Sequence, residues 1–197
     1  MITTAQEAVK HIKSGDNVYI HSVTAAPQAL VKAMSNRSDE LRDVSIYQIH
    51  TEGLAPYASP EKSDAFKIKA FFVGPNIRKN VQQGNGSYIP IFLSEAPGLF
   101  RKGIIHINVA LITVSPPDKH GYCSLGTSVD ISLAVVETAD LVIAQVNKHM
   151  PRTHGDGLIH KNHINIMVEE DELLPEIEIP ILTPEQLAIG KNIANLI

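Results

Sequence analysis

Residues 108–114 read Asn-Val-Ala-Leu-Ile-Thr-Val and residues 141–147 read Leu-Val-Ile-Ala-Gln-Val-Asn, and these two stretches decide the fold. Each is a short apolar run rich in β-branched residues, which is typical of a strand covered on both faces. Between them, residues 128–139 repeat apolar side chains at the spacing of an amphipathic helix. Two buried strands joined by a helix predict a parallel pair in an α/β sheet.

The same alternation extends toward the N-terminus. A first helix is predicted from Thr4, because Thr4 and Glu7 have the spacing of a capping box. Further strands are predicted at 17–23, 44–50, 70–74 and 87–93, helices at 26–36 and 76–82, and a helical turn capped by Ser94. We therefore predict an α/β domain with an open, mostly parallel sheet and helices on both faces.

From about residue 148 the sequence becomes polar and rich in histidine, with one predicted strand at 164–168. A last helix is predicted from Thr183, where Pro184 and Glu185 suit a first turn. The chain ends on apolar residues of this helix, which we interpret as a cut. We predict a domain over 1–182 and, over 183–197, the start of a linker or first helix leading to a further domain.

Composition excludes several classes of function. The 197 residues are 44% hydrophobic and carry a net charge of -4, with scattered lysine and arginine, so nucleic-acid binding is not expected. No apolar run reaches the roughly 20 residues that span a bilayer, so no membrane interaction is expected. Glu7 and Lys10 in the first helix argue against a signal peptide, and the single Cys123 cannot form an internal disulfide. We expect a cytoplasmic protein.

The loops that follow the predicted strands form the candidate ligand edge. Right-handed crossovers bring these loops to one edge of the sheet, beyond the carboxyl ends of the strands, where ligands bind. His21 and His50 follow two strands there and could bind a carboxylate or tune its pKa, or be ordinary, partly buried imidazoles. Glu52 could contact a substrate or act as a nucleophile, or be a solvated turn residue.

Residues 115–126 (SPPDKHGYCSLG) give the densest local signal. Pro116 and Pro117 stop a strand, and the residues that follow have turn chemistry, which favours a structural loop over catalysis by Asp118 or His120. Cys123 is interpreted as a small core residue rather than a thiol nucleophile. No complete set of acid, base and nucleophile is visible in the sequence.

Two other groups resemble known sites only weakly. Gly84-Asn85-Gly86 precedes a predicted strand rather than a helix, which favours a tight turn over a phosphate-binding loop. The residues His154, Asp156, His160 and His163 lack the spacing of the common zinc signatures, so no metal site is expected.

Four ordered blocks resemble the N-terminal domain of the acetyl-CoA hydrolase/transferase family. Residues 72–78 match the pattern FVGPNxR, and residues 90–100 match PxxLSExPxxF. Residues 109–126, which contain SPPDKHGYCSLG, are similar to the family's most recognisable stretch, and residues 146–156 match VNxxMPRTxGD. Within the family, the blocks resemble those of 4-hydroxybutyrate CoA-transferases and similar butyrate-type transferases.

The resemblance implies one half of a two-domain, usually dimeric CoA-transferase. In the family reaction a glutamate attacks an acyl-CoA, forms a glutamyl-CoA thioester and passes CoA to a carboxylate such as acetate. That glutamate lies in the second domain, so the nucleophile is expected beyond Ile197 and this chain alone is expected to be inactive. The coenzyme A thioester enters as a substrate, and no permanently bound cofactor is expected.

Edge geometry, rather than matched family positions, selects the residues expected to bind substrate on the acyl side of the cleft. They are His21, Ser22, His50, Thr51, Glu52, Gly53, Pro75 and Asn76. Three alternatives stay open: an acetyl-CoA hydrolase of the same family, in which water replaces the second carboxylate; a non-enzymatic binding module; and a separate subunit of a two-chain transferase.

Overall fold

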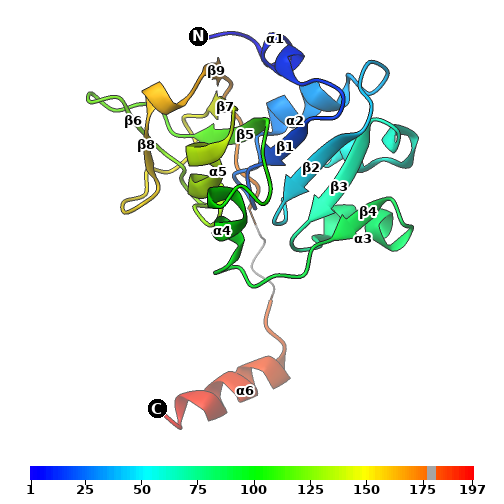
Figure 1. Ribbon diagram of the computed structural model, residues 1–197. Coiled ribbons are helices and arrows are strands. Elements are labelled where there is room, and N and C mark those ends of the chain that lie inside the picture. Colours follow the sequence, from blue (N-terminus) through cyan, green and yellow to red (C-terminus); the bar gives the residue numbers. More distant parts are fainter. Residues whose placement is uncertain (177–180) are drawn as a thin grey trace.

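The computed structural model describes residues 1–176 and 181–197 and contains a seven-stranded sheet (Figure 1). In spatial order the strands are β4 (Gly86–Tyr88), β3 (Phe66–Ala70), β2 (Val44–Gln48), β1 (Asn17–Ile20), β5 (Val109–Val114), β7 (Leu141–Val146) and β9 (Ile166–Glu169). All neighbouring pairs are parallel. The chain moves outward from β1 to β4 and then returns to β5 on the other side of β1, so the order reverses between β1 and β5.

Helices cover both faces of the sheet, as the sequence predicts. α1 (Ala5–Ala8), α2 (Gln28–Ser35) and α3 (Pro75–Gln82) pack on one apolar cluster, which includes Val18, Ile46 and Ile68 from the strands. α4 (Ala96–Arg101) and α5 (Ser132–Thr138) pack on a second cluster, on the opposite face, with Ala110 and Ile112. Because side chains alternate along a strand, β1 and β5 contribute to both clusters.

The two stretches that decide the fold form the predicted strands. β5 and β7 pair in parallel from Val109 beside Leu141 to Val114 beside Val146. All six residues of β5 and five of the six in β7 are buried. Each large apolar side chain that is fully buried in this way contributes about 1.5–3 kcal/mol to folding.

The predicted strand at 70–74 is wrong, because β3 lies earlier, at Phe66–Ala70. Phe66, Ile68 and Ala70 are buried on one face, while Lys67 is exposed and Lys69 half-buried on the other. A search for continuous apolar runs passes over a strand with one polar face. The residues after Ala70 form the loop that leads into α3.

The predicted strand at 87–93 is shortened to β4. Its last ladder bond runs from the Ile89 N–H to the Ala70 carbonyl, and Pro90 follows directly. Phe92 and Leu93 are exposed and belong to a loop. The following turn is α4, but its N-cap is Glu95 rather than the predicted Ser94.

A second, two-stranded sheet was not predicted. β6 (Tyr122–Ser124) pairs antiparallel with β8 (Leu158–His160). Both strands are only three residues long and lie in segments rich in turn residues, so they give no periodic signal.

The helix predicted at 128–139 begins later, at Ser132, because residues 126–131 form a loop. The Asp130 carboxylate accepts the N–H of Ser132 at 3.2 Å and so begins the helix. The last helix, α6 (Pro184–Ala194), begins where predicted; Thr183 is its N-cap and forms a full capping box with Gln186, and all residues of the helix are exposed. Over the described ranges 1–176 and 181–197, no helix has the length and hydropathy required to cross a membrane.

Candidate functional site

The reversal of strand order between β1 and β5 marks the candidate site. In open parallel sheets, the crossovers on either side of such a reversal leave a crevice beyond the carboxyl ends of the strands. Here the loop after β1 (21–27) meets the loop 126–131, which returns from the small β6–β8 sheet. Thr24 Oγ1 and Thr127 Oγ1 hydrogen-bond across the two loops at 3.0 Å. Sequence reasoning placed the first loop here but not the second.

His21 joins the segments around the crevice. Its ring is fully buried, Nδ1 accepts the N–H of Thr113 at 3.1 Å, and Nε2 lies 2.7 Å from the Ser128 carbonyl oxygen. Since Nδ1 is an acceptor, the proton of the neutral ring sits on Nε2 and is donated to Ser128. Burial lowers the pKa of His21, so the ring stays neutral. His21, a predicted site residue, is therefore buried and links Thr113 in β5 to Ser128 in the 126–131 loop.

A buried hydroxyl network lies beside His21. The Tyr19 hydroxyl hydrogen-bonds Ser22 Oγ at 3.1 Å and Ser132 Oγ at 2.8 Å. The Asp130 carboxylate accepts from Ser22 Oγ at 3.3 Å and from Ser132 Oγ at 3.1 Å. Burial, with Asp130 nearby, raises the pKa of Tyr19, so its hydroxyl stays protonated. Ser22, a predicted site residue, therefore holds the 126–131 loop against β1.

Val23 connects the β1 loop to the β2 loop through a strained backbone. Its N–H donates to the His50 carbonyl at 2.7 Å, and its carbonyl accepts the N–H of Glu52 at 3.0 Å. Val23 has φ 53°, which is rare for a β-branched residue. Such strain, of order 1–3 kcal/mol, clusters at binding and catalytic sites.

The turn Thr51-Glu52-Gly53 forms an outer wall that two side-chain amides fix. Gln28 Nε2 donates to the Glu52 carbonyl at 3.2 Å, and Gln28 Oε1 accepts the Leu54 N–H at 3.1 Å. Asn76 Nδ2 donates to Thr51 Oγ1 at 3.0 Å and to the Gly53 carbonyl at 3.4 Å. Gly53 has φ +84°, and a Cβ there would lie 2.9 Å from Gln28 Cδ. The two amides and the close approach of Gln28 to Gly53 therefore hold this turn in place.

Three buried polar atoms along this edge have no partner within the described chain: Gln48 Nε2, Asn76 Oδ1 and Ser128 Oγ. Gln48 ends β2, Asn76 opens α3 and Ser128 lies in the 126–131 loop. Tyr57 donates its hydroxyl to Gln48 Oε1 beneath the turn, and burial raises the Tyr57 pKa to about 12. Unpaired buried polar atoms are few in proteins and often mark working sites.

The structure brings the eight predicted residues to one edge but at two depths. His21, Ser22 and Thr51 are buried, whereas Glu52 and Asn76 are half-buried and Gly53 and Pro75 are exposed. His50 is half-buried, and its Cβ would lie 3.3 Å from a Cβ built on Gly74. The outer residues are open to solvent at this edge, and the buried ones lie beneath them.

Sequence reasoning missed several residues of the wall: Tyr19, Gln28, Ser128, Asp130, Ser132, Gln145 and Asn147. For one of them, Gln145, the sequence held a signal that could have identified it. Gln145 interrupts an otherwise apolar buried strand, and a buried amide requires partners for all its polar atoms.

Asp118 and Cys123, the other candidates considered from the sequence, have structural roles, as predicted. The Asp118 carboxylate accepts the N–H groups of His120 and Tyr122, both at 2.9 Å, and pairs with Arg152 at 2.7 Å. The hydrogen bond from Tyr122 and the other contacts lower the Asp118 pKa. Burial raises the pKa of the Cys123 thiol to about 11, which disfavours the reactive thiolate.

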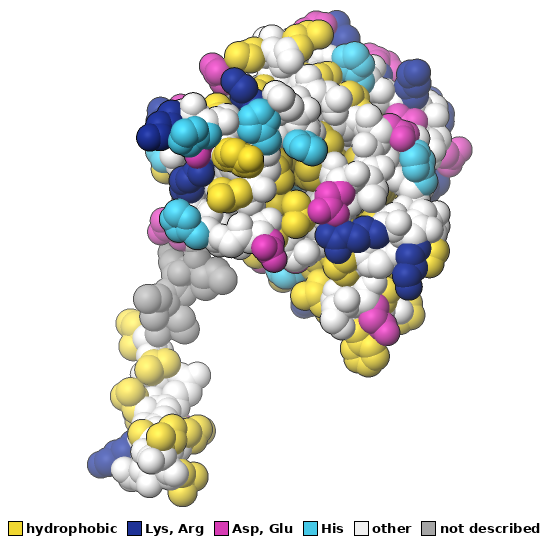
Figure 2. Space-filling view, turned by 60° about the vertical axis from the view of Figure 1, so that its left-hand side comes forward, with side chains coloured by type: hydrophobic (Ala, Val, Ile, Leu, Met, Phe, Trp, Pro, Cys, Tyr) yellow, Lys and Arg dark blue, Asp and Glu magenta, His cyan; other side chains and the backbone are white. Residues whose placement is uncertain are grey.

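Histidines gather on the side of the molecule that carries β6 and β8 (Figure 2). A hollow of about 220 Å³ there lies between Tyr122, Leu133, Ile159, His160 and His163. Both ring nitrogens of His160 have partners, the His120 carbonyl at 3.2 Å and the Asn162 N–H at 3.3 Å. Within residues 1–176 and 181–197, no three His, Cys, Asp or Glu side chains cluster as metal ligands.

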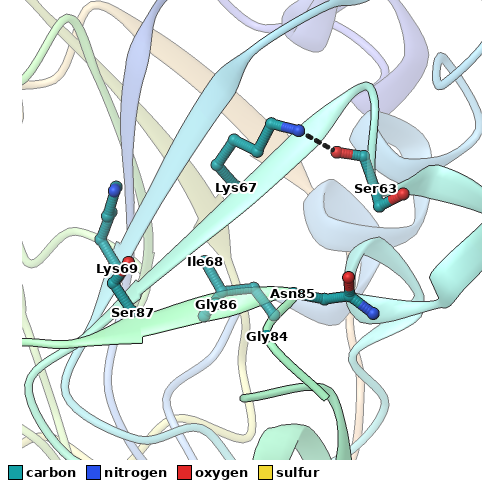
Figure 3. A pocket seen from close by; sticks show the side chains of 8 residues that line it. All are labelled: Ser63, Lys67, Ile68, Lys69, Gly84, Asn85, Gly86 and Ser87. Carbon is teal, nitrogen blue, oxygen red and sulfur yellow. Dashed lines mark hydrogen bonds between the residues drawn. The ribbon is translucent and has the colours of Figure 1, made fainter. Parts of the chain in front are cut away.

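Gly84 and Asn85 lead into β4, as predicted, and Gly86 is its first residue; the three residues border another hollow of about 220 Å³ (Figure 3). Lys67 and Lys69 also line it, but Lys67 Nζ donates to the Ser63 carbonyl at 2.6 Å and lies 4.0 Å from Asp43. Figure 3 shows the two lysine side chains pointing apart. This hollow lies beside β3 and β4, away from the reversal between β1 and β5.

Comparison with known proteins gives a family match that spans most of the chain. The model of the acetyl-CoA hydrolase/transferase N-terminal domain matches residues 1–178. A succinyl-CoA:acetate/propanoyl-CoA:succinate CoA transferase of Fasciola hepatica is 42% identical over 84% of this chain and 34% of its own length. The 4-hydroxybutyrate coenzyme A transferase of Clostridium kluyveri is 39% identical over 100% of this chain and 46% of its own.

Solved structures show the same fold. The crystal structure of RipA from Yersinia pestis superposes with a TM-score of 0.90 at 32% identity, over 99% of this chain and 48% of that one. The 4-hydroxybutyrate CoA-transferase of Porphyromonas gingivalis gives 0.81 at 32% identity, over 100% and 45%. The predicted fold class is confirmed, and the chain spans less than half the length of these proteins.

Proposed function

Because this chain belongs to the acetyl-CoA hydrolase/transferase family, we propose that it is the N-terminal half of a CoA-transferase. The whole protein moves CoA from a short-chain acyl-CoA, such as 4-hydroxybutyryl-, butyryl- or acetyl-CoA, to a carboxylate such as acetate. The observation that carries the proposal is the family match over residues 1–178, supported by relatives that are named CoA transferases.

The reaction exchanges one thioester for another. A glutamate carboxylate attacks the acyl carbonyl, CoA thiolate leaves, and the thiolate then attacks the mixed anhydride to give glutamyl-CoA and the free acid. The acceptor carboxylate repeats these steps in reverse. The bonds broken and formed are of similar energy, so no outside energy source is needed. We place the nucleophilic glutamate beyond Ile197.

This half contributes the acyl side of the cleft. We assign contact with the acyl group to the outer residues His50, Glu52, Gly53, Pro75 and Asn76. A second, buried set holds them in place: His21, Ser22 and Thr51. The fixed turn at Gly53 supports this assignment, since a wall that keeps its shape orients a substrate at little entropic cost.

The remaining proposals concern organisation. Residues 1–182 form the N-terminal domain and 183–197 begin the connection to a second, catalytic domain. The whole protein is a cytoplasmic homodimer with CoA thioesters as substrates rather than bound cofactors. The family match over residues 1–178 and the greater length of the relatives support the two-domain part of this proposal.

The experiment is an assay of the protein expressed from its full coding sequence. Butyryl-CoA is supplied with and without acetate, and acetyl-CoA and free CoA are separated by chromatography. A transferase forms acetyl-CoA only when acetate is present. Free CoA released at a rate that acetate does not change indicates the hydrolase instead, and no turnover indicates a binding module. Activity that needs a second, co-purifying chain indicates a two-chain transferase.

A further inference from the structure

Residues 170–172, which follow β9, are held by two buried side-chain amides. Gln145, in β7 and 1% exposed, donates from Nε2 to the Glu170 carbonyl at 3.3 Å and to Glu172 Oε2 at 2.8 Å. Asn147, directly after β7 and also 1% exposed, donates from Nδ2 to the Glu172 carbonyl at 2.7 Å and accepts its N–H at 3.3 Å. This segment is therefore fixed across the carboxyl end of β7.

Gln145 also contacts helix α2. Gln145 Oε1 accepts the N–H of Ala29, in the first turn of α2, at 3.3 Å. The neighbouring residue of that turn is Gln28, which holds the Glu52 carbonyl and the Leu54 N–H. Gln145 and Gln28 thus connect the segment 170–172, through the first turn of α2, to the turn at Glu52–Leu54, which we call the acyl wall.

Stability alone does not require an amide at position 145. The other residues of β7 are apolar, and an apolar side chain of similar length can be buried without hydrogen-bond partners. A buried amide with all its polar groups paired gives instead a fixed geometry, because each hydrogen bond is strong and directional in a low dielectric. Both donors and the acceptor of Gln145 are used.

On the basis of the proposed function, we infer that Gln145 is a positioning residue for CoA transfer. It sets where the chain after Glu172 leaves the sheet relative to the Glu52–Leu54 turn. Figure 1 shows that the chain after β9 runs toward the edge to which the strand arrowheads point. Because the chain continues from Glu172 to the rest of the protein, the position of this exit helps to place the nucleophilic glutamate against the acyl wall.

The first arm of the test measures the anchor in this chain and does not depend on catalysis. In Gln145→Met, hydrogen exchange of the backbone amides at 170–172 should rise at least about tenfold, because the bonds to Glu170 and Glu172 are lost. Lys148→Ala is the matched control, since it removes only the exposed 2.6 Å pair with Asp171. Unchanged exchange in Gln145→Met overturns the anchor. If this variant does not fold, Glu172→Ala removes the 2.8 Å contact with Gln145 Nε2 and leaves the bond to the Glu170 carbonyl, so exchange should rise by a smaller factor, and unchanged exchange overturns the anchor.

The second arm measures kcat and KM of the protein expressed from its full coding sequence. Misplacement of reacting groups by about 1 Å costs on the order of a hundredfold in rate, so Gln145→Met should lower kcat at least about tenfold and leave KM for acyl-CoA within about twofold. Glu172→Gln keeps an acceptor for Gln145 and should keep most of kcat. Unchanged kcat with raised exchange makes Gln145 a structural staple only. An inactive wild type overturns the proposed function, whereas the first arm still decides the anchor.

Discussion

The Nε2 of His21 lies 2.7 Å from the carbonyl oxygen of Ser128, across 107 residues of sequence. With its other nitrogen on the Thr113 N–H, this imidazole connects the β1 loop, β5 and the 126–131 loop where the strand order reverses. These three segments are therefore held together by a neutral, buried ring.

Replacement of His21 should destabilise the domain. In His21→Phe, the Ser128 carbonyl and the Thr113 N–H both lose their partner, at about 1–3 kcal/mol for each buried group. We expect the free energy of unfolding to fall by at least about 2 kcal/mol in urea denaturation. His154→Phe, at an exposed histidine, is the control and should change it by less than about 0.5 kcal/mol. Equal effects of the two substitutions would show that the His21 contacts carry no stability.

The contribution of His21 should also depend on pH. Its folded-state pKa is lowered by burial, while the unfolded chain binds a proton near pH 6.5. Below that pH the unfolded state holds more protons than the folded state. The free energy of unfolding therefore decreases as the pH is lowered, by up to about 1.4 kcal/mol per pH unit. The difference in unfolding free energy between wild type and His21→Phe should thus shrink from pH 7 to pH 5. A constant difference would mean that His21 binds protons equally in the folded and unfolded states, so that burial does not lower its pKa.

The strands of the sheet could be predicted from the sequence where a continuous run of apolar residues marks them. β5 and β7 were predicted because both faces are covered and their sequences are apolar throughout. β3 was misplaced because its lysines face away from the core, and β8 was missed because three residues show no period. The strand ends were close enough to bring the eight predicted site residues to one edge.

The sequence did not predict which of these eight residues are buried and which are exposed. His21 and Ser22 are buried because residues 126–131 return to cover them, and the contacts that bring that loop back join Tyr19 to Ser132 and Ser22 to Asp130. Partners 113 and 108 residues apart leave no trace in a local pattern. The same reason hid the contact between Gln145 and Glu172.

Gly53 should tolerate a methyl group worse than an equally strained glycine elsewhere. Gly53 and Gly15 both have φ +84°, but a Cβ at Gly15 meets no atom within 4 Å, whereas one at Gly53 meets Gln28. Gly15→Ala should lower the unfolding free energy by about 1–2 kcal/mol from the backbone alone. Gly53→Ala should lower it further and release the Leu54 N–H to faster exchange. Matching values for the two variants would remove Gln28 from the account of this turn.

Cys123 should react slowly in the folded chain. Its side chain is buried and its pKa is raised to about 11, so little thiolate is present at pH 8. With a disulfide reagent, labelling should be slow in buffer and reach one equivalent per chain in urea, since the sequence has one cysteine. Fast labelling of the native chain would reopen the thiol as a candidate nucleophile.

The most direct test of the central claim is to map where CoA becomes attached. The protein expressed from its full coding sequence is incubated with butyryl-CoA, digested and examined by mass spectrometry for a glutamyl-CoA adduct or its borohydride reduction product. We predict an adduct on one glutamate outside residues 1–197 and none when this chain is incubated alone. An adduct on a glutamate within the chain, with Glu52 the first to inspect, would contradict the account.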